Sequence, residues 1–346
     1  MLACAGSDVG AEGEHVRVPN PGLTPELLKT GAPDTNRTCD LPLRRGLLYP
    51  LSYRGARANF TRMRWFLFSG LFLAAAAVSA QAWAWEDGVT PFVVSPDAVV
   101  ERMLYLAQPK AGERLVDLGS GDGRIVIEAA KRFGARGLGV DIDPRLVELA
   151  RGNAKLAGVE SLASFEVRDL FETDLRGVSV VTMYLLPEVN LQLLPRFIDQ
   201  LKPGARIVSH DYDLGPWPFD EMIELALAEK MVGPLGRSRV FLWVVPADAR
   251  GRWIAELPEL GGRWQLDIAQ KFQVLDVDAR AGVSVMLVRG ARLRGEEIRL
   301  AVTGIVGGKG YNLLFRGRVA EGRIEGDLRI SDGDSARTIP WRASRQ

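Results

Sequence analysis

The sequence predicts an α/β fold, a sheet with helices on both faces, followed by a small all-β domain. Strand-length apolar runs recur between residues 114 and 245, and segments with helical spacing alternate with them, which is typical of an α/β domain. After residue 250 helical periodicity disappears and short β-rich runs alternate with glycine turns, which indicates an all-β domain. With 346 residues, 47% of them hydrophobic, the chain is long enough to hold both.

The elements of the first domain follow one another in a regular order. Residues 96–106 show helical spacing after a turn-rich start, and this helix is expected to pack on the edge of the sheet. Residues 114–118 form a short apolar run typical of a buried strand, and 125–132 have the spacing of the helix that follows it. Further strands are expected at 136–141, 164–170, 177–183, 205–209 and 240–245, and further helices around Leu191, Leu194 and Phe197 and at 219–229.

A glycine-rich turn follows the first strand in the sequence Asp117-Leu-Gly-Ser-Gly-Asp-Gly. Gly119, Gly121 and Gly123 permit backbone angles and a close approach that side chains would prevent, and the next helix presents N–H groups to a polar ligand. A dinucleotide site would have its third glycine where this chain has Arg124, and a P-loop would continue with Gly-Lys-Ser or Gly-Lys-Thr. The acid before the glycines, Asp117, favours S-adenosylmethionine as the ligand. The alternative is an ordinary tight turn.

Two further acids end neighbouring strands. Asp141 ends the second strand, where its carboxylate can accept both hydroxyl hydrogens of a ribose. Asp169 ends the third strand and is placed to accept from the exocyclic amine of adenine, while Leu170 packs on the base. The alternative is that each acid is a helix N-cap, a position that Asp favours.

These motifs resemble the successive cofactor motifs of class I S-adenosylmethionine-dependent methyltransferases, over roughly Thr90 to Pro246. The resemblance implies a Rossmann-like seven-stranded methyltransferase sheet that binds S-adenosylmethionine. The cofactor-binding residues it implies are Asp117, Gly119, Ser120, Gly121, Asp122, Gly123, Asp141, Asp169 and Leu170.

A narrower resemblance concerns the membrane-anchored protein-lysine methyltransferases, whose mitochondrial members modify the ATP synthase c subunit and the adenine nucleotide translocase. The strings that carry it, besides the glycine turn, are Thr90-Pro-Phe-Val, Tyr184-Leu-Leu-Pro and Leu201-Lys-Pro-Gly. It implies a protein-lysine acceptor, and it implies that residues 90–93 help to close the mouth of the cofactor site. A linker that buries Phe92 is the alternative for that segment.

Methyl transfer to an amine is an in-line displacement in which positioning dominates. Tyr184 follows the fourth strand, at the sheet edge where ligands of open α/β sheets bind, and is the predicted catalytic residue that orients the amine. Glu188 and Asn190 are weaker candidates, because both are also suited to capping the next helix. His210 is a candidate base, although a lone histidine at a strand end is more often a packed, hydrogen-bonded residue.

The composition argues against several other chemistries. Cys4, Cys39 and His15 lie upstream of every predicted globular segment, so we expect no disulfide framework, no cysteine nucleophile and no metal site. Lys and Arg number 44 against 43 Asp and Glu, and the two signs are interspersed, so no nucleic-acid partner is expected.

The first 85 residues divide into two parts. Residues 1–62 lack periodicity and are rich in Gly, Pro and Arg, which predicts disorder. Residues 36–50 resemble a translated transfer-RNA gene, so the alternative is spurious upstream translation with Met63 as the start. Residues 63–85 join a basic flank to an apolar run, as in a signal peptide or a transmembrane anchor.

The apolar segment predicts where the protein acts. Its basic flank places the methyltransferase domain, residues 86–247, on the periplasmic side, exported or membrane-anchored. S-adenosylmethionine is made in the cytoplasm and is charged, which leaves three alternatives: the domain faces the cytoplasm, the cofactor is supplied across the membrane, or another ligand binds. The expected partners are the membrane, through this segment, and a protein substrate such as a membrane protein.

Residues 250–346 predict an antiparallel β sandwich or barrel whose role is open: substrate binding, oligomerisation or covering the first domain. The leading functional prediction is a protein-lysine N-methyltransferase. The rivals are a small-molecule methyltransferase and an exported, non-catalytic binding protein with a vestigial cofactor pocket.

Overall fold

The computed structural model describes residues 93–228, 230 and 233–346. The predictions for residues 1–62 and 63–85 lie outside these ranges, as does most of the segment 90–93. None of the helices within the described ranges is both long enough and apolar enough to cross a membrane.

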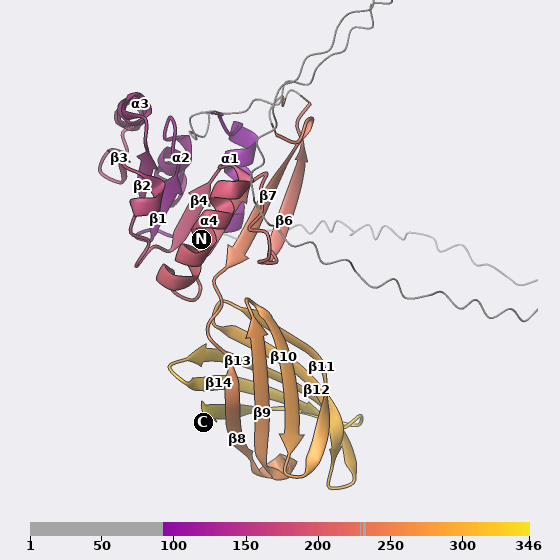
Figure 1. Ribbon diagram of the computed structural model, residues 1–346. Helices are drawn as coiled ribbons and strands as arrows, with labels where there is room; N and C mark the ends of the chain where they lie inside the picture. The colour runs from indigo at the N-terminus through magenta and orange to yellow at the C-terminus, as the bar shows by residue number, and fades with distance from the viewer. Residues whose placement is uncertain (1–92, 229, 231–232) are drawn as a thin grey trace, which may run out of the picture. The chain divides into compact units, whose positions relative to one another are not determined.

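The first domain contains a mixed sheet with the strand order β3-β2-β1-β4-β5-β7-β6 (Figure 1). Its strands are β1 (Arg114–Leu118), β2 (Arg136–Asp141), β3 (Ala163–Val167), β4 (Val180–Met183), β5 (Arg206–His210), β6 (Glu221–Ala226) and β7 (Arg237–Val244). Neighbours among β1 to β5 are parallel, whereas β7 is antiparallel to both β5 and β6. The carboxyl ends of the five parallel strands therefore meet at one edge, as the Rossmann-like fold requires.

The local sequence explains where the helices of this domain begin and end. They are α1 (Asp97–Ala107), α2 (Arg124–Phe133), α3 (Pro144–Leu156) and α4 (Pro187–Gln200). Before α3, the carboxylate of Asp143 accepts a hydrogen bond from the backbone N–H of Arg145, and proline occupies the first helical position. Gly123 and Gly134, which flank α2, both have left-handed backbone conformations.

Consecutive residues of the central strands enter two hydrophobic clusters. Val180 and Val208 belong to a cluster that includes apolar side chains of α1, α2 and α3. Their neighbours Val181 and Ile207 belong to a cluster that includes apolar side chains of α4. Because both sets are buried, these strands are apolar runs and do not alternate between apolar and polar residues.

One predicted element is wrong, because residues 219–229 do not form a helix. Glu221–Ala226 form β6, which pairs antiparallel with β7 at the edge of the sheet. The segment is rich in good helix formers, but Ile223, Leu225 and Leu227 are spaced two apart and pack against one cluster. Pairing with β7 and burial of this row outweigh intrinsic helix propensity.

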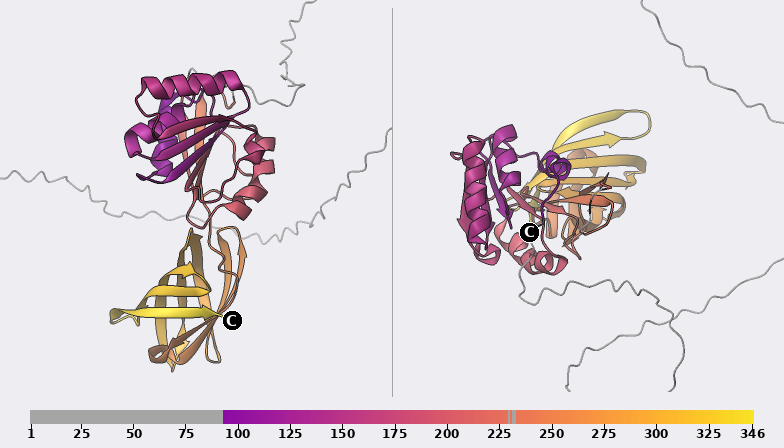
Figure 2. Two further views of the ribbon diagram at one scale, coloured as in Figure 1. Left: turned by 90° about the vertical axis from the view of Figure 1, so that its left-hand side faces the viewer. Right: turned by 90° about the horizontal axis from the view of Figure 1, so that it is seen from above.

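The second domain is a closed antiparallel barrel, which decides between the two expected architectures (Figure 2). Its strands are β8 (Gly251–Leu257), β9 (Gly262–Lys271), β10 (Val274–Ala281), β11 (Ser284–Arg294), β12 (Glu297–Val306), β13 (Lys309–Ala320), β14 (Arg323–Ser331) and β15 (Ala336–Arg345). Consecutive strands pair with each other, and β15 pairs with β8 to close the barrel.

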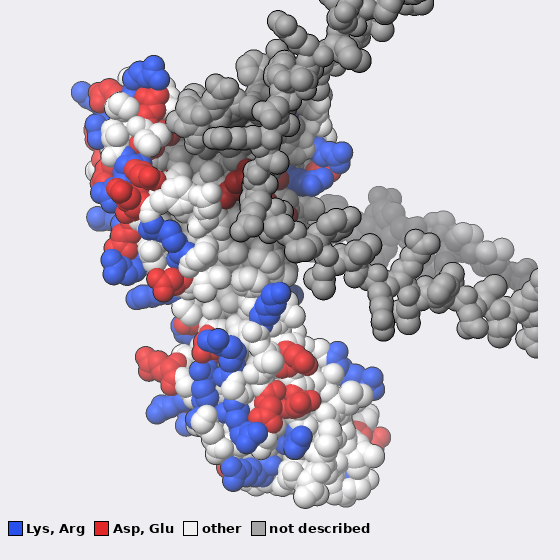
Figure 3. Space-filling model, in the orientation of Figure 1, with Lys and Arg blue, Asp and Glu red and all other residues white. Residues whose placement is uncertain are grey.

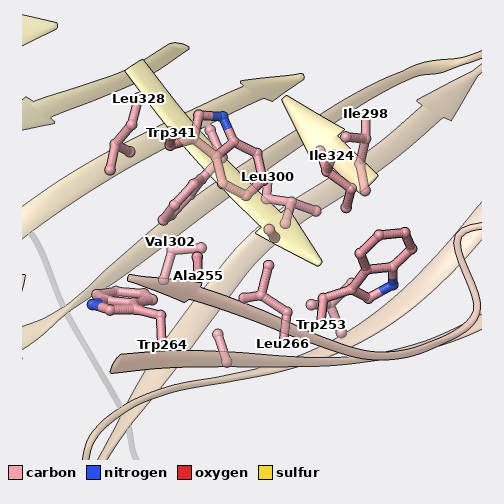
Figure 4. Close-up of a cluster of buried hydrophobic side chains, with 14 of the residues drawn as sticks. Trp253, Ala255, Trp264, Leu266, Ile298, Leu300, Val302, Ile324, Leu328 and Trp341 are labelled. Carbon is pink, nitrogen blue, oxygen red and sulfur yellow. The ribbon is translucent and has the colours of Figure 1, made fainter. Parts of the chain in front are cut away.

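Large side chains fill the interior of this barrel. Trp253, Trp264 and Trp341 are buried among aliphatic residues of other strands, such as Leu300 and Leu328 (Figure 4). The indole N–H of each tryptophan donates to a backbone carbonyl, so its burial leaves no polar group unsatisfied. Side chains thus occupy the space in which some barrels of this size bind a ligand.

Candidate active site

The glycine-rich turn between β1 and α2 has the backbone geometry that its sequence predicts. Gly119, Gly121 and Gly123 have positive φ angles of 75°, 54° and 81°. The N–H groups of Gly119 and Ser120 both donate to the carbonyl of Val140 in β2, each at 2.9 Å. These bonds fix the turn to the neighbouring strand and leave Gly119 exposed at the sheet edge.

Glycine is also required for packing beneath the turn. A Cβ atom on Gly123 would lie 2.6 Å from Cζ of Phe165 and 2.9 Å from Cβ of Ala150. A Cβ atom on Gly139 in β2 would lie 2.5 Å from Cδ1 of the same phenylalanine. The two glycines therefore make room for the ring of Phe165, which supports the turn from β3.

Asp117 lies inside the sheet, with only 2% of its surface exposed. Its carboxylate accepts a 2.7 Å hydrogen bond from the hydroxyl of Thr182 in β4. Burial raises the pKa of Asp117 to about 7; the hydrogen bond opposes this shift, and the charges of Asp141 and Asp122 add to it. A carboxyl group in this state ionises readily when a cation is placed near it.

The carboxylate of Asp141 holds the turn from the end of β2. Its Oδ2 atom accepts from the N–H of Gly121 at 2.9 Å, and its Oδ1 atom accepts from the N–H of Asp143 at 3.0 Å. The residue is half-buried, and each oxygen retains a lone pair. Asp141 can therefore accept from ribose hydroxyls without releasing the turn.

The other two polar residues of the turn differ in their partners. Asp122 forms an ion pair with Arg124, whose guanidinium nitrogen lies 2.6 Å from its Oδ2 atom. The hydroxyl of Ser120 is buried and has no hydrogen-bond partner among the described residues. Buried polar groups are normally paired, so this hydroxyl is able to bond to a polar ligand at the turn.

Asp169 is an N-cap, which is the alternative that the sequence offered to a contact with adenine. Its carboxylate accepts a 2.8 Å hydrogen bond from the N–H of Phe171, in a 3₁₀ turn (Leu170–Glu172) that follows β3. Asp169 is also exposed, and it lines a hollow of about 430 Å³ together with Ile142 and Val167. Capping uses one carboxylate oxygen, so it is compatible with a ligand in this hollow.

Tyr184 follows β4 directly beside the glycine turn. The next residue, Leu185, packs against the turn so closely that a Cβ atom on Gly119 would lie 2.9 Å from its Cδ2 atom. The hydroxyl of Tyr184 donates a 3.2 Å hydrogen bond to Oδ2 of Asp211. Burial, reinforced by the charge of Asp211, raises the pKa of Tyr184 well above its usual range, so its hydroxyl remains protonated at neutral pH.

The imidazole ring of His210 packs against the ring of Tyr184, with the two ring centroids 3.9 Å apart. The imidazole is fully buried, and its nitrogens are bonded to the hydroxyls of Ser95 and Ser238, both at 2.9 Å. Burial lowers the pKa of His210 to about 4. The ring is neutral and both nitrogens are engaged, which favours a packed histidine over a base.

Asn190 and Glu188 occupy different environments. Asn190 is fully buried inside α4, so the interpretation as a cap is wrong. Its amide donates to the carbonyls of Tyr212 and Asp213, both at 3.3 Å, and fastens the segment after β5 to the helix. Glu188 lies exposed in the first turn of α4.

The sequence did not single out Asp211 and Lys230, which lie beside Tyr184. Lys230 Nζ forms an ion pair with Oδ2 of Asp211. Asp211 comes directly after β5, so it is another strand-end acid, and that signal could have identified it. Lys230 lies beyond β6, and no spacing in the sequence relates it to the other residues of the site.

Several known proteins are similar to this chain. A family model described as the ANTKMT methyltransferase domain matches residues 117–221. A protein-lysine N-methyltransferase of Saccharolobus islandicus is 40% identical over 136 residues, which are 39% of this chain and 84% of that protein. The adenine nucleotide translocase lysine N-methyltransferase of Mus musculus is 38% identical over 128 residues, which are 37% of this chain and 55% of that protein.

A solved structure is also similar. The RNA methyltransferase of Salinibacter ruber, crystallised with S-adenosyl-L-homocysteine, is 49% identical and superimposes with a TM-score of 0.40, covering 44% of this chain and 93% of that one. The relative from Saccharolobus islandicus shows the family, because most of its length is matched at 40% identity. The chain therefore belongs to the S-adenosylmethionine-dependent protein-lysine methyltransferases of the ANTKMT type.

Proposed function

We propose that the glycine turn binds S-adenosylmethionine and that Tyr184 orients the lysine side chain of a protein acceptor beside it. The observation that carries this proposal is the contact between Leu185 and Gly119. Because Leu185 follows Tyr184 directly, this contact places Tyr184 close to the glycine turn. It brings a polar hydroxyl and a cofactor turn to one edge of the sheet, where ligands of such sheets bind.

Four features support the placement of the cofactor. Asp141 has lone pairs available for ribose hydroxyls, and Asp169 borders a hollow that lies beside Ile142, the residue after Asp141. Ser120 has a buried hydroxyl without a partner among the described residues. Asp117 supplies a carboxyl group whose ionised form is favoured by the cationic cofactor.

The residues of this chain contribute positioning more than acid-base chemistry. Bound S-adenosylmethionine supplies an electrophilic methyl group. The acceptor Nζ, bound as an ammonium, would release one proton to solvent and use the freed lone pair to take this methyl group, with S-adenosylhomocysteine as the leaving group. Tyr184 remains protonated, so it orients the amine and does not remove its proton.

Helices on both faces of the sheet complete the proposed architecture. The two hydrophobic clusters support it, because α1 to α3 share one cluster and α4 belongs to the other, and because strand residues alternate between them.

A protein acceptor agrees better with the charge distribution than a nucleic acid does. Figure 3 shows acidic and basic side chains interspersed over the face it draws. Many of the basic groups are paired with acids, as in Arg132 with Glu101 and Arg239 with Glu224. Binding to a phosphate backbone instead favours a continuous basic surface.

The membrane is part of the proposal through residues 63–85, which lie outside the described residues. We propose a membrane-anchored or exported protein with its catalytic domain on the periplasmic side, the cytoplasmic face being the alternative. The apolar run and basic flank support an anchor, and the mouse relative is named for the adenine nucleotide translocase. A membrane protein is therefore the proposed acceptor, and protease accessibility in spheroplasts tests the side on which the domain lies.

The decisive experiment uses the full chain with methyl-deuterated S-adenosylmethionine and either a membrane extract or total RNA. We expect mass spectrometry to find the label on lysine residues of protein. Label confined to RNA or to small molecules contradicts the proposal. The rival function, a non-catalytic binding protein with a vestigial cofactor pocket, requires that wild type does not bind S-adenosylmethionine. Calorimetry with the same cofactor tests it.

Two variants assign this cofactor binding to the site. Asp141→Ala is expected to weaken binding at least about tenfold, because it removes both the ribose acceptor and a bond that holds the turn. Asp278→Ala, at an exposed position on β10, is the matched control and is expected to bind as wild type does. Equal binding by wild type and Asp141→Ala would exclude the proposed site.

A further inference from the structure

A primary ammonium group is already bound next to Tyr184, and it comes from this chain. Nζ of Lys230 donates to Oδ2 of Asp211 and to the carbonyl of Arg237, the latter at 3.0 Å. The side chains of Lys230 and Asp211 are 6% and 0% exposed. The long stem of Lys230 therefore carries its charge into an interior position, which lysine adopts only when its charge is paired.

The carboxylate of Asp211 is oriented by several neighbours. Its Oδ1 atom accepts a 3.1 Å hydrogen bond from the N–H of Arg239, while Oδ2 accepts from the hydroxyl of Tyr184. The backbone of Asp211 has a φ of 64°, an unusual value for a residue other than glycine. Strain of this kind persists where the surrounding structure fixes a functional group.

The position of this ion pair relates it to methyl transfer. Oδ2 of Asp211 accepts hydrogen bonds from both Lys230 and Tyr184. The residue after Tyr184 packs on the glycine turn. Gly233 adjoins the same group of oxygens, because a Cβ atom there would lie 3.0 Å from Oδ2 of Asp211 and 3.5 Å from the hydroxyl of Tyr184. A lysine that enters beside Tyr184 therefore meets the carboxylate that Lys230 occupies.

We propose that Asp211 binds the ammonium group of the acceptor lysine, and that Lys230 occupies this site until the acceptor displaces it. The proposal rests on the proposed function for the identity of the acceptor. The ligand class is a primary alkylammonium ion. Oδ2 of Asp211 already accepts from the Tyr184 hydroxyl and from Lys230, so an acceptor ammonium that binds this oxygen has to displace Lys230 and the two lysines compete.

A binding experiment tests this without catalysis. Lys230→Ala empties the site, and n-butylamine, a four-carbon primary amine like the lysine side chain, is the probe. We expect n-butylamine at about ten times its dissociation constant to raise the melting temperature of Lys230→Ala by about 2–5 °C. Wild type should respond much less at the same concentration, because its own lysine competes. Lys230→Gln serves with the same expectations if Lys230→Ala does not fold.

Three controls make the result specific. n-Butanol has no charge and should leave the melting temperature unchanged. The double variant Lys230→Ala/Asp211→Asn should not respond to the amine. Lys155→Ala, which removes an exposed lysine on α3, should respond as wild type does. An equal response to butanol, or no response at all, overturns the proposal and leaves Lys230 as a structural ion pair.

A kinetic measurement separates this proposal from the proposed function. With an acceptor from the membrane extract, Lys230→Ala should lower KM at least about threefold relative to Lys155→Ala, because no internal lysine competes. An amine-dependent melting shift without any methylation would refute the proposed function alone. Methylation with an unchanged KM and no melting shift would refute only the role of Asp211 and Lys230.

Discussion

The hydroxyl of Thr182 in β4 donates a 2.7 Å hydrogen bond to the carboxylate of Asp117, its direct neighbour in β1. Both residues are buried in the sheet. The hydrogen bond favours the ionised carboxylate, and burial disfavours it by more, so the pKa of Asp117 rises to about 7. The pair therefore keeps the carboxyl group of Asp117 partly ionised near neutral pH. This group lies in β1, two residues before Gly119, the first glycine of the turn.

This pKa predicts a pH dependence of cofactor binding. S-adenosylmethionine carries a positive sulfonium, so it should bind more tightly to the ionised form of Asp117. Between pH 6 and pH 8 the ionised fraction of a group with a pKa of about 7 rises about tenfold, and affinity should rise by up to this factor. Calorimetry at both pH values measures it.

Two comparisons identify Asp117 as the source of that pH dependence. S-adenosylhomocysteine, with a neutral sulfur, should show a smaller change between pH 6 and pH 8. Asp117→Asn should bind S-adenosylmethionine with nearly the same affinity at both values. If the asparagine variant retained the full slope, another group would be responsible.

The same shift predicts an effect on stability with the opposite pH trend. Because the pKa of Asp117 is raised from 3.8 to about 7 on folding, the folded state binds the proton more strongly than the unfolded state. Stability from this source is complete below pH 4 and is lost as the pH rises to about 7. The melting temperature of Asp117→Asn relative to wild type should therefore be higher at pH 8 than at pH 5. Asp278→Asn, at an exposed site, should show no such trend, and an equal difference at both pH values for Asp117→Asn would contradict the argument.

Gly123 and Gly112 form a matched pair for testing the glycine turn. Their φ angles are 81° and 80°, but a Cβ atom would clash with Phe165 only at Gly123, since nothing lies within 4 Å of the Cβ position at Gly112. Gly112→Ala should cost about 1–2 kcal/mol of unfolding free energy from backbone strain alone. Gly123→Ala should cost about 2–5 kcal/mol, because overpacking adds to the strain. Urea denaturation measures both, and equal losses would mean that Phe165 moves aside freely.

Tyr184→Phe should separate positioning from binding. The variant loses the hydrogen bond to Asp211 but keeps the ring that packs on His210, so cofactor affinity should not change. We expect kcat to fall by about tenfold to a hundredfold, because the acceptor amine is held less well. The pH profile of kcat should keep its shape near neutrality, since Tyr184 does not ionise there. Tyr105→Phe, at an exposed position on α1, is the control, and a shifted pH profile in Tyr184→Phe would indicate an acid-base role.

Local patterns explain which parts of the site could be predicted. The turn from Asp117 to Gly123 follows from residue types within seven positions, and its positive φ angles are the ones that glycine permits. The predicted helix at 219–229 was wrong because β6 forms by pairing with β7, which begins eleven residues further along the chain. Intrinsic propensity does not encode such a pairing. Asp211 and Lys230 were missed for a similar reason: their contact joins a residue just after β5 to one beyond β6, and no local pattern relates the two.

The tryptophan-filled interior of the barrel restricts the surfaces through which this domain can bind another molecule. With Trp253, Trp264 and Trp341 taking up its centre, this domain has only its outer wall and hairpin tips with which to touch another molecule. Substitutions on that wall leave the inward-facing side chains untouched, since neighbouring positions on a strand face opposite ways. Partner choice could thus diverge among related proteins while the barrel itself, and the methyl-transfer machinery of the other domain, remain as they are.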